Sequence, residues 1–230
     1  MSDINFDFIG KYWPYFTDGA ALTLIISVFV IALGMVLGVI FALMKRSRIS
    51  LLRAIATIYI EVLRGTPMLL QILVGYILIR VDFGSFNLGI LNVDSSRLIP
   101  GIIAIGINSS AYVAEIIRGG INSIGQGQTE AAFSLGLKPL QAMRYVVMPQ
   151  AIRNILPSIG NEFITIIKDS SLLSTIGIME LLNGSQTVIL ATYQPLAPLI
   201  VAAAFYLVMT LALGRLLKLY EDHIERAYVK

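Results

Sequence analysis

Four polar side chains recur at intervals of four, three and four residues within an otherwise apolar segment. They are Ser158, Glu162, Thr165 and Asp169. At 100° per residue of an α-helix, these positions fall within about 60° of one another and form a single polar stripe. A charged side chain in the middle of a bilayer costs roughly 2.5–3.5 kcal/mol or more, so such residues usually line a water-filled path or a binding site. The stripe therefore predicts a site where two carboxylates face a cationic group.

A second apolar segment carries a matching polar face, formed by Asn108, Tyr112 and Glu115. Arg118 lies one turn beyond Glu115 and is placed to pair with it. We expect a polar cavity between the two segments, which Lys168 partly neutralises from a neighbouring face. Two alternatives remain open at this point. The side chains could satisfy one another inside a helix bundle, or they could lie at the level of the lipid headgroups.

The rest of the chain excludes most enzymatic chemistry. There is no cysteine, and the single histidine, His223, lies in a charged tail. A thiol nucleophile is therefore excluded, and we expect neither a metal site nor a catalytic triad. No glycine-rich phosphate-binding loop of the GxxxxGK[ST] type occurs in the sequence, so we expect the chain not to bind ATP.

The composition is typical of an integral membrane protein. Hydrophobic residues make up 57% of the 230 residues and charged residues only 13%, against about 25% charged residues in soluble domains. Apolar segments long enough to cross a hydrocarbon core of about 30 Å recur along the chain. We predict an all-α integral membrane protein, residues 1–230 forming one domain, with five transmembrane helices at about 20–44, 54–79, 98–117, 154–181 and 196–217.

The basic residues orient these spans. Lysines and arginines concentrate after the first, third and fifth spans, at Lys45, Arg46, Arg48, Arg53, Arg118, Lys138, Arg144, Arg153, Arg215, Lys218, Arg226 and Lys230. Because basic residues favour the cytoplasmic side, the N-terminus is predicted outside and the C-terminus inside. The net charge of +3 follows from this bias and needs no nucleic-acid partner. Glu61 and Arg64, three residues apart, are interpreted as a structural ion pair near the cytoplasmic end.

The segment from about residue 125 to 153 then forms a cytoplasmic loop with the pattern of two short helices. Thr129 is placed to cap a helix that begins at Glu130. Gly136 is suited to end that helix in a left-handed conformation, and Pro139 to begin the next one. An apolar side is formed by Phe133, Leu135, Leu140 and Val146. The alternative interpretation is an amphipathic helix pair that lies on the bilayer surface.

This loop resembles the signature loop of ABC importer permeases. That family pattern is Glu-Ala-Ala, three residues, Gly, nine residues, and a hydrophobic triplet followed by Pro. Here it is met by Glu130-Ala131-Ala132, Gly136 and Val146-Val147-Met148-Pro149, with Val and Met where the family typically has Ile and Leu. Three more stretches, 61–67, 111–120 and 168–174, resemble the permease subunits of polar amino-acid importers of the glutamine, arginine and histidine group.

The resemblance implies a set of partners. The loop, through Glu130, Ala131, Ala132 and Gly136, is expected to couple to a dimer of separate ABC ATPase subunits, which bind ATP and Mg²⁺. The chain itself is expected to have no cofactor. Five helices are few for enclosing a path, so a second copy or a related permease is expected to complete it on a two-fold axis. An extracytoplasmic binding protein is expected to deliver the amino acid to a multi-pass protein of the cell membrane.

The resemblance also gives the polar residues a substrate. Glu162 and Asp169 are expected to face a cationic side chain or the α-ammonium group, and Asn108 to hydrogen-bond the α-carboxylate. The full set of expected substrate residues is Glu162, Asp169, Asn108, Ser158, Thr165 and Tyr112. Two carboxylates and one lysine favour arginine or lysine, or glutamine if Lys168 cancels more charge. The alternatives are a proton- or sodium-coupled secondary transporter and a purely structural membrane protein.

Overall fold

The computed structural model describes the backbone of residues 5–228 and the side chains of residues 5–222. The side chains of His223, Arg226 and Lys230, which the sequence analysis mentions, lie outside this range. Three described helices are long and apolar enough to cross a membrane, and these are α1 (Ile9–Lys45), α4 (Ser95–Asn122) and α9 (Ala197–Tyr228). The bent pair α2 (Ser50–Gly65) and α3 (Met68–Leu78) gives a fourth candidate span.

Helix α1 packs against α4 through small residues. A β-carbon on Gly34 would lie 3.0 Å from the Ser109 hydroxyl oxygen, and one on Gly38 would lie 2.5 Å from a Val113 methyl carbon. The Gly34/Gly38 pair is therefore an interface within the chain, where the absence of side chains lets two helix backbones approach. This close packing makes α1 and α4 the scaffold on which the other helices lie.

The segment predicted as one span over residues 54–79 is broken. Helices α2 and α3 meet at an angle of 110°, because Thr66 and Pro67 have extended backbone conformations and a proline nitrogen cannot donate a helical hydrogen bond. Two side-chain amides donate hydrogen bonds to the backbone carbonyl oxygens at the break. The Gln71 Nε2 donates to Leu63 O at 2.9 Å and to Thr66 O at 3.2 Å, and Asn108 Nδ2 donates to Leu63 O at 3.1 Å.

A small antiparallel hairpin, which the sequence analysis did not predict, precedes α4. It joins β1 (Ser85–Leu88) to β2 (Leu91–Asp94) through a two-residue turn in which Gly89 has a φ of +59°. The Asp18 carboxylate of α1 accepts from the Ile90 N–H at 2.8 Å. Asp94 caps α4, and the Ser96 hydroxyl and backbone N–H that it accepts from lower the pKa of its carboxyl group. The hairpin thus fixes where α4 begins.

The segment predicted as a span at 154–181 is also not one continuous α-helix. Helix α7 (Met148–Asp169) continues as a 3₁₀-helix, η2 (Ser170–Ile176), and the chain then turns at Gly177 with a φ of +77° into α8 (Leu181–Thr192). Glu180, fully buried, caps α8 by accepting from the backbone N–H groups of Leu182 and Asn183 at 2.9 and 2.8 Å. The Tyr206 hydroxyl of α9 donates to the same carboxylate at 2.6 Å, which joins α8 to α9.

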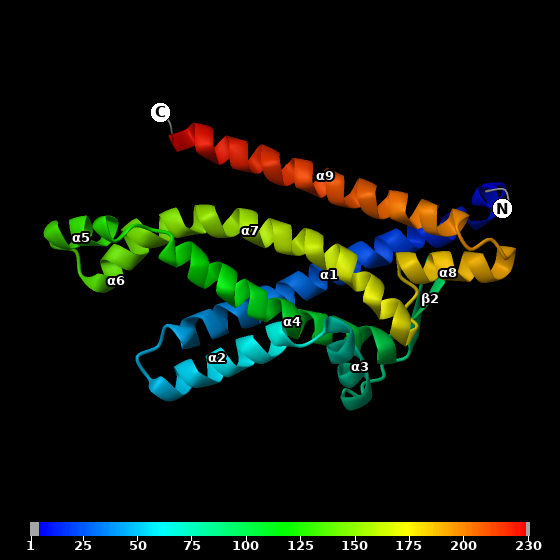
Figure 1. The fold of residues 1–230 in the computed structure, drawn as a ribbon, viewed down its shortest axis with the longest axis horizontal. Coiled ribbons are helices and arrows are strands. Elements are labelled where there is room, and N and C mark those ends of the chain that lie inside the picture. Colours follow the sequence, from blue (N-terminus) through cyan, green and yellow to red (C-terminus); the bar gives the residue numbers. More distant parts are fainter. Residues whose placement is uncertain (1–4, 229–230) are drawn as a thin grey trace.

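The two ends of the molecule differ in what they contain (Figure 1). The short helices α5 (Gln126–Ser134) and α6 (Pro139–Ala142) lie at one end, together with the α1–α2 connection and the C-terminal end of α9. The start of α1, the hairpin and α8 lie at the opposite end. The described chain therefore begins and ends at opposite ends of the bundle.

Candidate functional site

The loop between α4 and α7 has the two-helix form that the sequence predicts. Helix α5 ends in a Schellman motif, because the Gly136 N–H donates to Phe133 O at 2.9 Å and the Leu137 N–H donates to Ala132 O at 3.1 Å. Gly136 has the predicted left-handed conformation, with a φ of +80°. The predicted cap is wrong, since α5 begins at Gln126 and has no side-chain cap.

The second half of the loop leads directly into α7. Pro139 is the first residue of α6, and the backbone N–H of Lys138 donates to the Gln141 side-chain oxygen at 2.9 Å. A single π-helical turn, η1 (Met143–Val147), joins α6 to α7. The loop is therefore joined by continuous helical backbone to α7, which carries the polar stripe.

The loop exposes a patch of large apolar side chains. The exposed fractions are 46% for Phe133, 83% for Leu135, 78% for Leu140 and 63% for Tyr145, and these four residues are the loop patch from here on. Of the residues expected to contact the ATPase, Glu130, Ala131 and Gly136 are exposed, whereas Ala132 is buried within the loop. An exposed cluster of this kind is typical of a protein-binding surface.

The polar stripe lies along α7 as predicted, and one of its carboxylates is engaged. Glu162 is partly buried, and its Oε1 accepts from the Ser109 hydroxyl of α4 at 2.8 Å. The hydroxyls of Ser158 and Thr165 donate to backbone carbonyls one turn back in α7. Asp169 is partly buried and Thr165 exposed. Within this chain alone the stripe is thus open on one side.

Asn108 and Tyr112, the two expected substrate residues on α4, lie in different surroundings. Asn108 is 3% exposed, and its Nδ2 donates to Leu63 O and to Gln71 Oε1 at 3.1 and 2.9 Å. Both amide hydrogens are thereby used at the α2–α3 break, which leaves none for a carboxylate. Tyr112 is 38% exposed, and the Arg64 guanidinium lies over its ring at 5.3 Å from the centroid. Sequence analysis missed Ser109 and Gln71, although both are polar residues in apolar segments.

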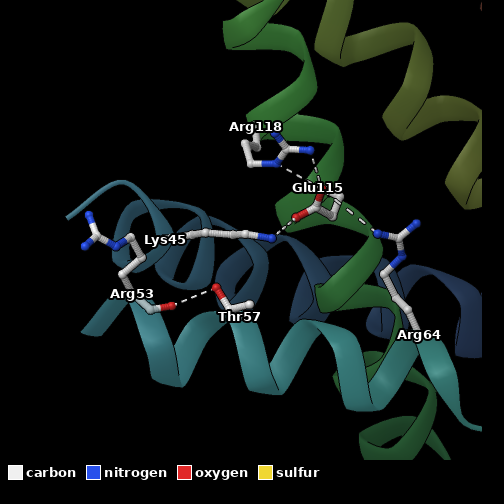
Figure 2. A network of polar contacts seen from close by, with 6 residues as sticks. All are labelled: Lys45, Arg53, Thr57, Arg64, Glu115 and Arg118. Carbon is white, nitrogen blue, oxygen red and sulfur yellow. Dashed lines mark hydrogen bonds and ion pairs between the residues drawn. The ribbon is translucent and has the colours of Figure 1, made fainter. Parts of the chain in front are cut away.

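A charge cluster joins three helices near the end that carries the loop (Figure 2). Glu115 of α4 accepts from Lys45 of α1 at 2.6 Å and from Arg118 at 2.7 Å, and Arg64 of α2 lies 4.0 Å away. The predicted Glu115–Arg118 pair is confirmed. Among side chains 5–222, the ion pair of Arg64 is with Glu115 and not with Glu61, so the Glu61–Arg64 prediction is wrong. Three cations surround one carboxylate, whose side chain is 16% exposed.

Metal chemistry has no support within the described residues. In residues 5–222 there is no group of three or more histidine, cysteine, aspartate or glutamate side chains that could hold a metal ion. In addition to the buried Glu180 cap of α8, three polar features of the structure are the stripe, the α2–α3 break and the charge cluster. All three are suited to contacts with a polar solute or to joining helices.

Comparison with known proteins identifies the family. Residues 34–226 match the family described as the inner membrane component of binding-protein-dependent transport systems. The chain belongs to this family. It is 36% identical over 222 residues to a putative glutamine transport system permease of Rickettsia bellii, which covers 95% of this chain and 98% of the relative. It is 38% identical over 200 residues to an arginine transport system permease of Bacillus subtilis, with 87% and 88% covered.

Solved structures agree with the fold. The crystal structure of an amino acid ABC transporter with histidines contains a chain that is 41% identical, with a TM-score of 0.85, and the match covers 95% of this chain and 99% of that one. An inward-facing structure of a methionine ABC transporter is 18% identical, with a TM-score of 0.63 and 99% of both chains covered. The second match shows that the fold persists when the sequence has diverged.

Membership of this family decides between the function classes. The chain is a multi-pass permease of the inner membrane that works in an ABC importer, and the ATP is bound and hydrolysed by a separate subunit. A proton- or sodium-coupled transporter and a purely structural membrane protein are thereby set aside. Its partners in general are an ATPase subunit and a binding protein.

Proposed function

We propose that this permease imports polar amino acids with a preference for basic ones, arginine or lysine, and that Glu162 and Asp169 receive the cationic group. The observation that carries the proposal is the stripe of α7, where Glu162 is tied to Ser109 of α4 at 2.8 Å. A carboxylate held by a neutral hydroxyl keeps its negative charge available for a cationic ligand. Glutamine is the second candidate, because relatives such as the permease of Escherichia coli, 36% identical over 212 residues, are named for glutamine transport.

The proposed site includes five of the six expected residues directly. Ser158 and Thr165 alternate with the carboxylates along α7 and offer hydroxyl oxygens to the substrate, and Tyr112 offers a ring face and a phenol from α4. Asn108 is assigned a supporting role at the α2–α3 break, since both of its amide hydrogens are engaged there. The binding energy then comes mainly from the two carboxylates.

A second permease, identical or related, completes the path in this proposal. The stripe is partly exposed in the single chain, and charged groups at this depth need a polar or aqueous surrounding. A two-fold axis facing α7 would place two stripes around one path. Residues 1–230 would then act as one transmembrane domain of five spans, with α7 contributing the fourth. A dimer of ATPase subunits would bind the two loops.

The proposed orientation places the N-terminus outside and the C-terminus in the cytoplasm. Two observations support it. The loop helices, the α1–α2 connection and the C-terminal end of α9 lie at the same end of the molecule (Figure 1). The basic residues Lys45, Arg46, Arg48 and Arg53 belong to that end as well, as the positive-inside rule requires. The binding protein would then deliver substrate at the end that carries the hairpin and α8.

Transport by reconstituted protein tests this function. The permease, its ATPase and its binding protein are placed in proteoliposomes, and ATP-dependent uptake of labelled arginine and glutamine is measured. Glu162→Gln should lower arginine uptake about tenfold or more, because a charge-assisted hydrogen bond contributes about 1.5–3 kcal/mol and 1.4 kcal/mol is a factor of ten. Glu61→Gln, which alters an exposed carboxylate of α2, is the control. Unchanged arginine uptake by Glu162→Gln would remove Glu162 from the site.

A further inference from the structure

An apolar groove runs between α1, α4 and α7 at the end of the molecule that carries the loop. Its volume is about 340 Å³. The floor is formed by the buried residues Ala42, Val113 and Ile155, and the walls by exposed ones, including Val39 at 44% and Ile152 at 43%. The groove is therefore open at the outer surface of the helix bundle and closed at its base.

The length of the groove matches one leaflet of a bilayer. Its lining on α1 extends from Met35 to Arg46, a distance of about 16 Å at 1.5 Å per residue. Half of a hydrocarbon core of about 30 Å is about 15 Å. An extended acyl chain that enters from the near surface of the membrane could follow the groove over its full length.

Among the described residues, Arg46 is the one charged residue that lines this groove, and it lies at the end of the groove next to the α1–α2 connection. Its one hydrogen bond among side chains 5–222 is a long one, 3.4 Å from Nη1 to the neutral Asn122 side-chain oxygen. No carboxylate pairs with it in that range, in contrast to the neighbouring Lys45, which is bound to Glu115. Arg46 is exposed and is therefore free to bind an anion at the membrane surface.

We propose that the groove holds an acyl chain of an anionic phospholipid from the leaflet on the loop side, with the lipid phosphate bound to Arg46. The apolar lining excludes a polar solute such as an amino acid, and the basic rim favours an anionic headgroup over a zwitterionic one. A guanidinium can donate two hydrogen bonds to one phosphate. The site is separate from the proposed substrate residues, none of which lines the groove.

The location of this lipid gives it an effect on the transporter. Met143 and Met148, at the junction between the loop and α7, belong to the groove lining, and flexible methionine side chains adapt readily to a bound chain. A chain seated there supports the connection through which loop movements reach α7. The lipid is thus a structural ligand of the coupling region.

Photolabelling of the intact complex tests the proposal. The permease–ATPase complex is placed in nanodiscs of phosphatidylcholine and phosphatidylglycerol that contain a phosphatidylglycerol with a diazirine in its acyl chain. We expect label on peptides from α1 and from the segment Met143–Ile159, and competition by unlabelled phosphatidylglycerol but not by phosphatidylcholine. Arg46→Gln should lower this labelling about fivefold, whereas Arg53→Gln, an exposed arginine outside the groove, should leave it unchanged.

A second pair of variants separates the groove from the headgroup contact. Val39→Trp fills the groove and should abolish labelling, and Val36→Trp, on an exposed position of α1 that does not line it, should not. Equal labelling of Arg46→Gln and the native complex would overturn the proposal. So would an absence of lipid label from the native complex, combined with loss of the ATPase or of a second permease from the Val39→Trp complex, because a protein would then occupy the groove.

Discussion

At the scale of single residues, the charges of this protein join helices that are far apart in the sequence. Glu115 binds Lys45 and Arg118 and lies near Arg64, so one carboxylate connects α4 to α1 and α2. The Arg118 contact could be predicted, because residues three apart face each other on a helix. The contacts with Lys45 and Arg64 could not, since they depend on how helices pack. The same limit explains why Ser109 was missed as the partner of Glu162.

Neutralising Glu115 should weaken this junction. In Glu115→Gln three cations would surround a neutral amide, and their mutual repulsion would no longer be offset. The carboxylate is largely buried but its partners are 22–44% exposed, so solvent screening limits the loss to roughly 1–2 kcal/mol of unfolding free energy. Thermal unfolding in detergent measures it. Glu61→Gln is the matched control, and equal unfolding temperatures for the two variants would contradict the proposed role of the cluster.

At the scale of elements, sequence reasoning found the helices but not the interruptions within them. The segment at 54–79 predicts a continuous span, and Gly65 and Pro67 are the local signs of the 110° bend. The bend is stabilised by Gln71 and Asn108, which come from different helices. The change from α7 to η2 could not be predicted either. Nor could the role of Glu180 as a buried cap of α8, because a carboxylate in an apolar segment predicts a binding site as readily as a helix cap.

The two amides at the α2–α3 break should be energetically coupled. Asn108→Leu and Gln71→Leu should each destabilise the protein by about 1 kcal/mol, since side-chain hydrogen bonds in membrane proteins contribute about 0.6 and at most about 1.7 kcal/mol. The double variant should lose less than the sum of the two, because the bond between Asn108 Nδ2 and Gln71 Oε1 is lost only once. Chemical unfolding in micelles completes this double-mutant cycle. Strictly additive losses would show that the amides act independently.

At the scale of the whole molecule, composition and the distribution of basic residues were sufficient to predict a membrane protein. The Glu-Ala-Ala loop was sufficient to predict its family. The hairpin before α4 escaped prediction because each of its two strands has only four residues, too few for their alternation of polar and apolar residues to stand out. The groove along α1 escaped it because a cavity arises from three helices together. What positions the loop relative to α7 is likewise a property of the assembled bundle.

The exposed loop patch is expected to decide whether the complex as a whole assembles. Leu135 is 83% exposed and packs against little of its own chain, so Leu135→Asp should leave the permease folded. If an ATPase binds this surface, the variant buries an unpaired charge in the interface and should weaken binding about thirtyfold, the 2 kcal/mol typical of an interface hot spot. The ATPase recovered with the tagged permease measures this. Phe83→Asp, an 82% exposed residue near the hairpin at the other end of the molecule, is the control. Full recovery with Leu135→Asp would place the ATPase elsewhere.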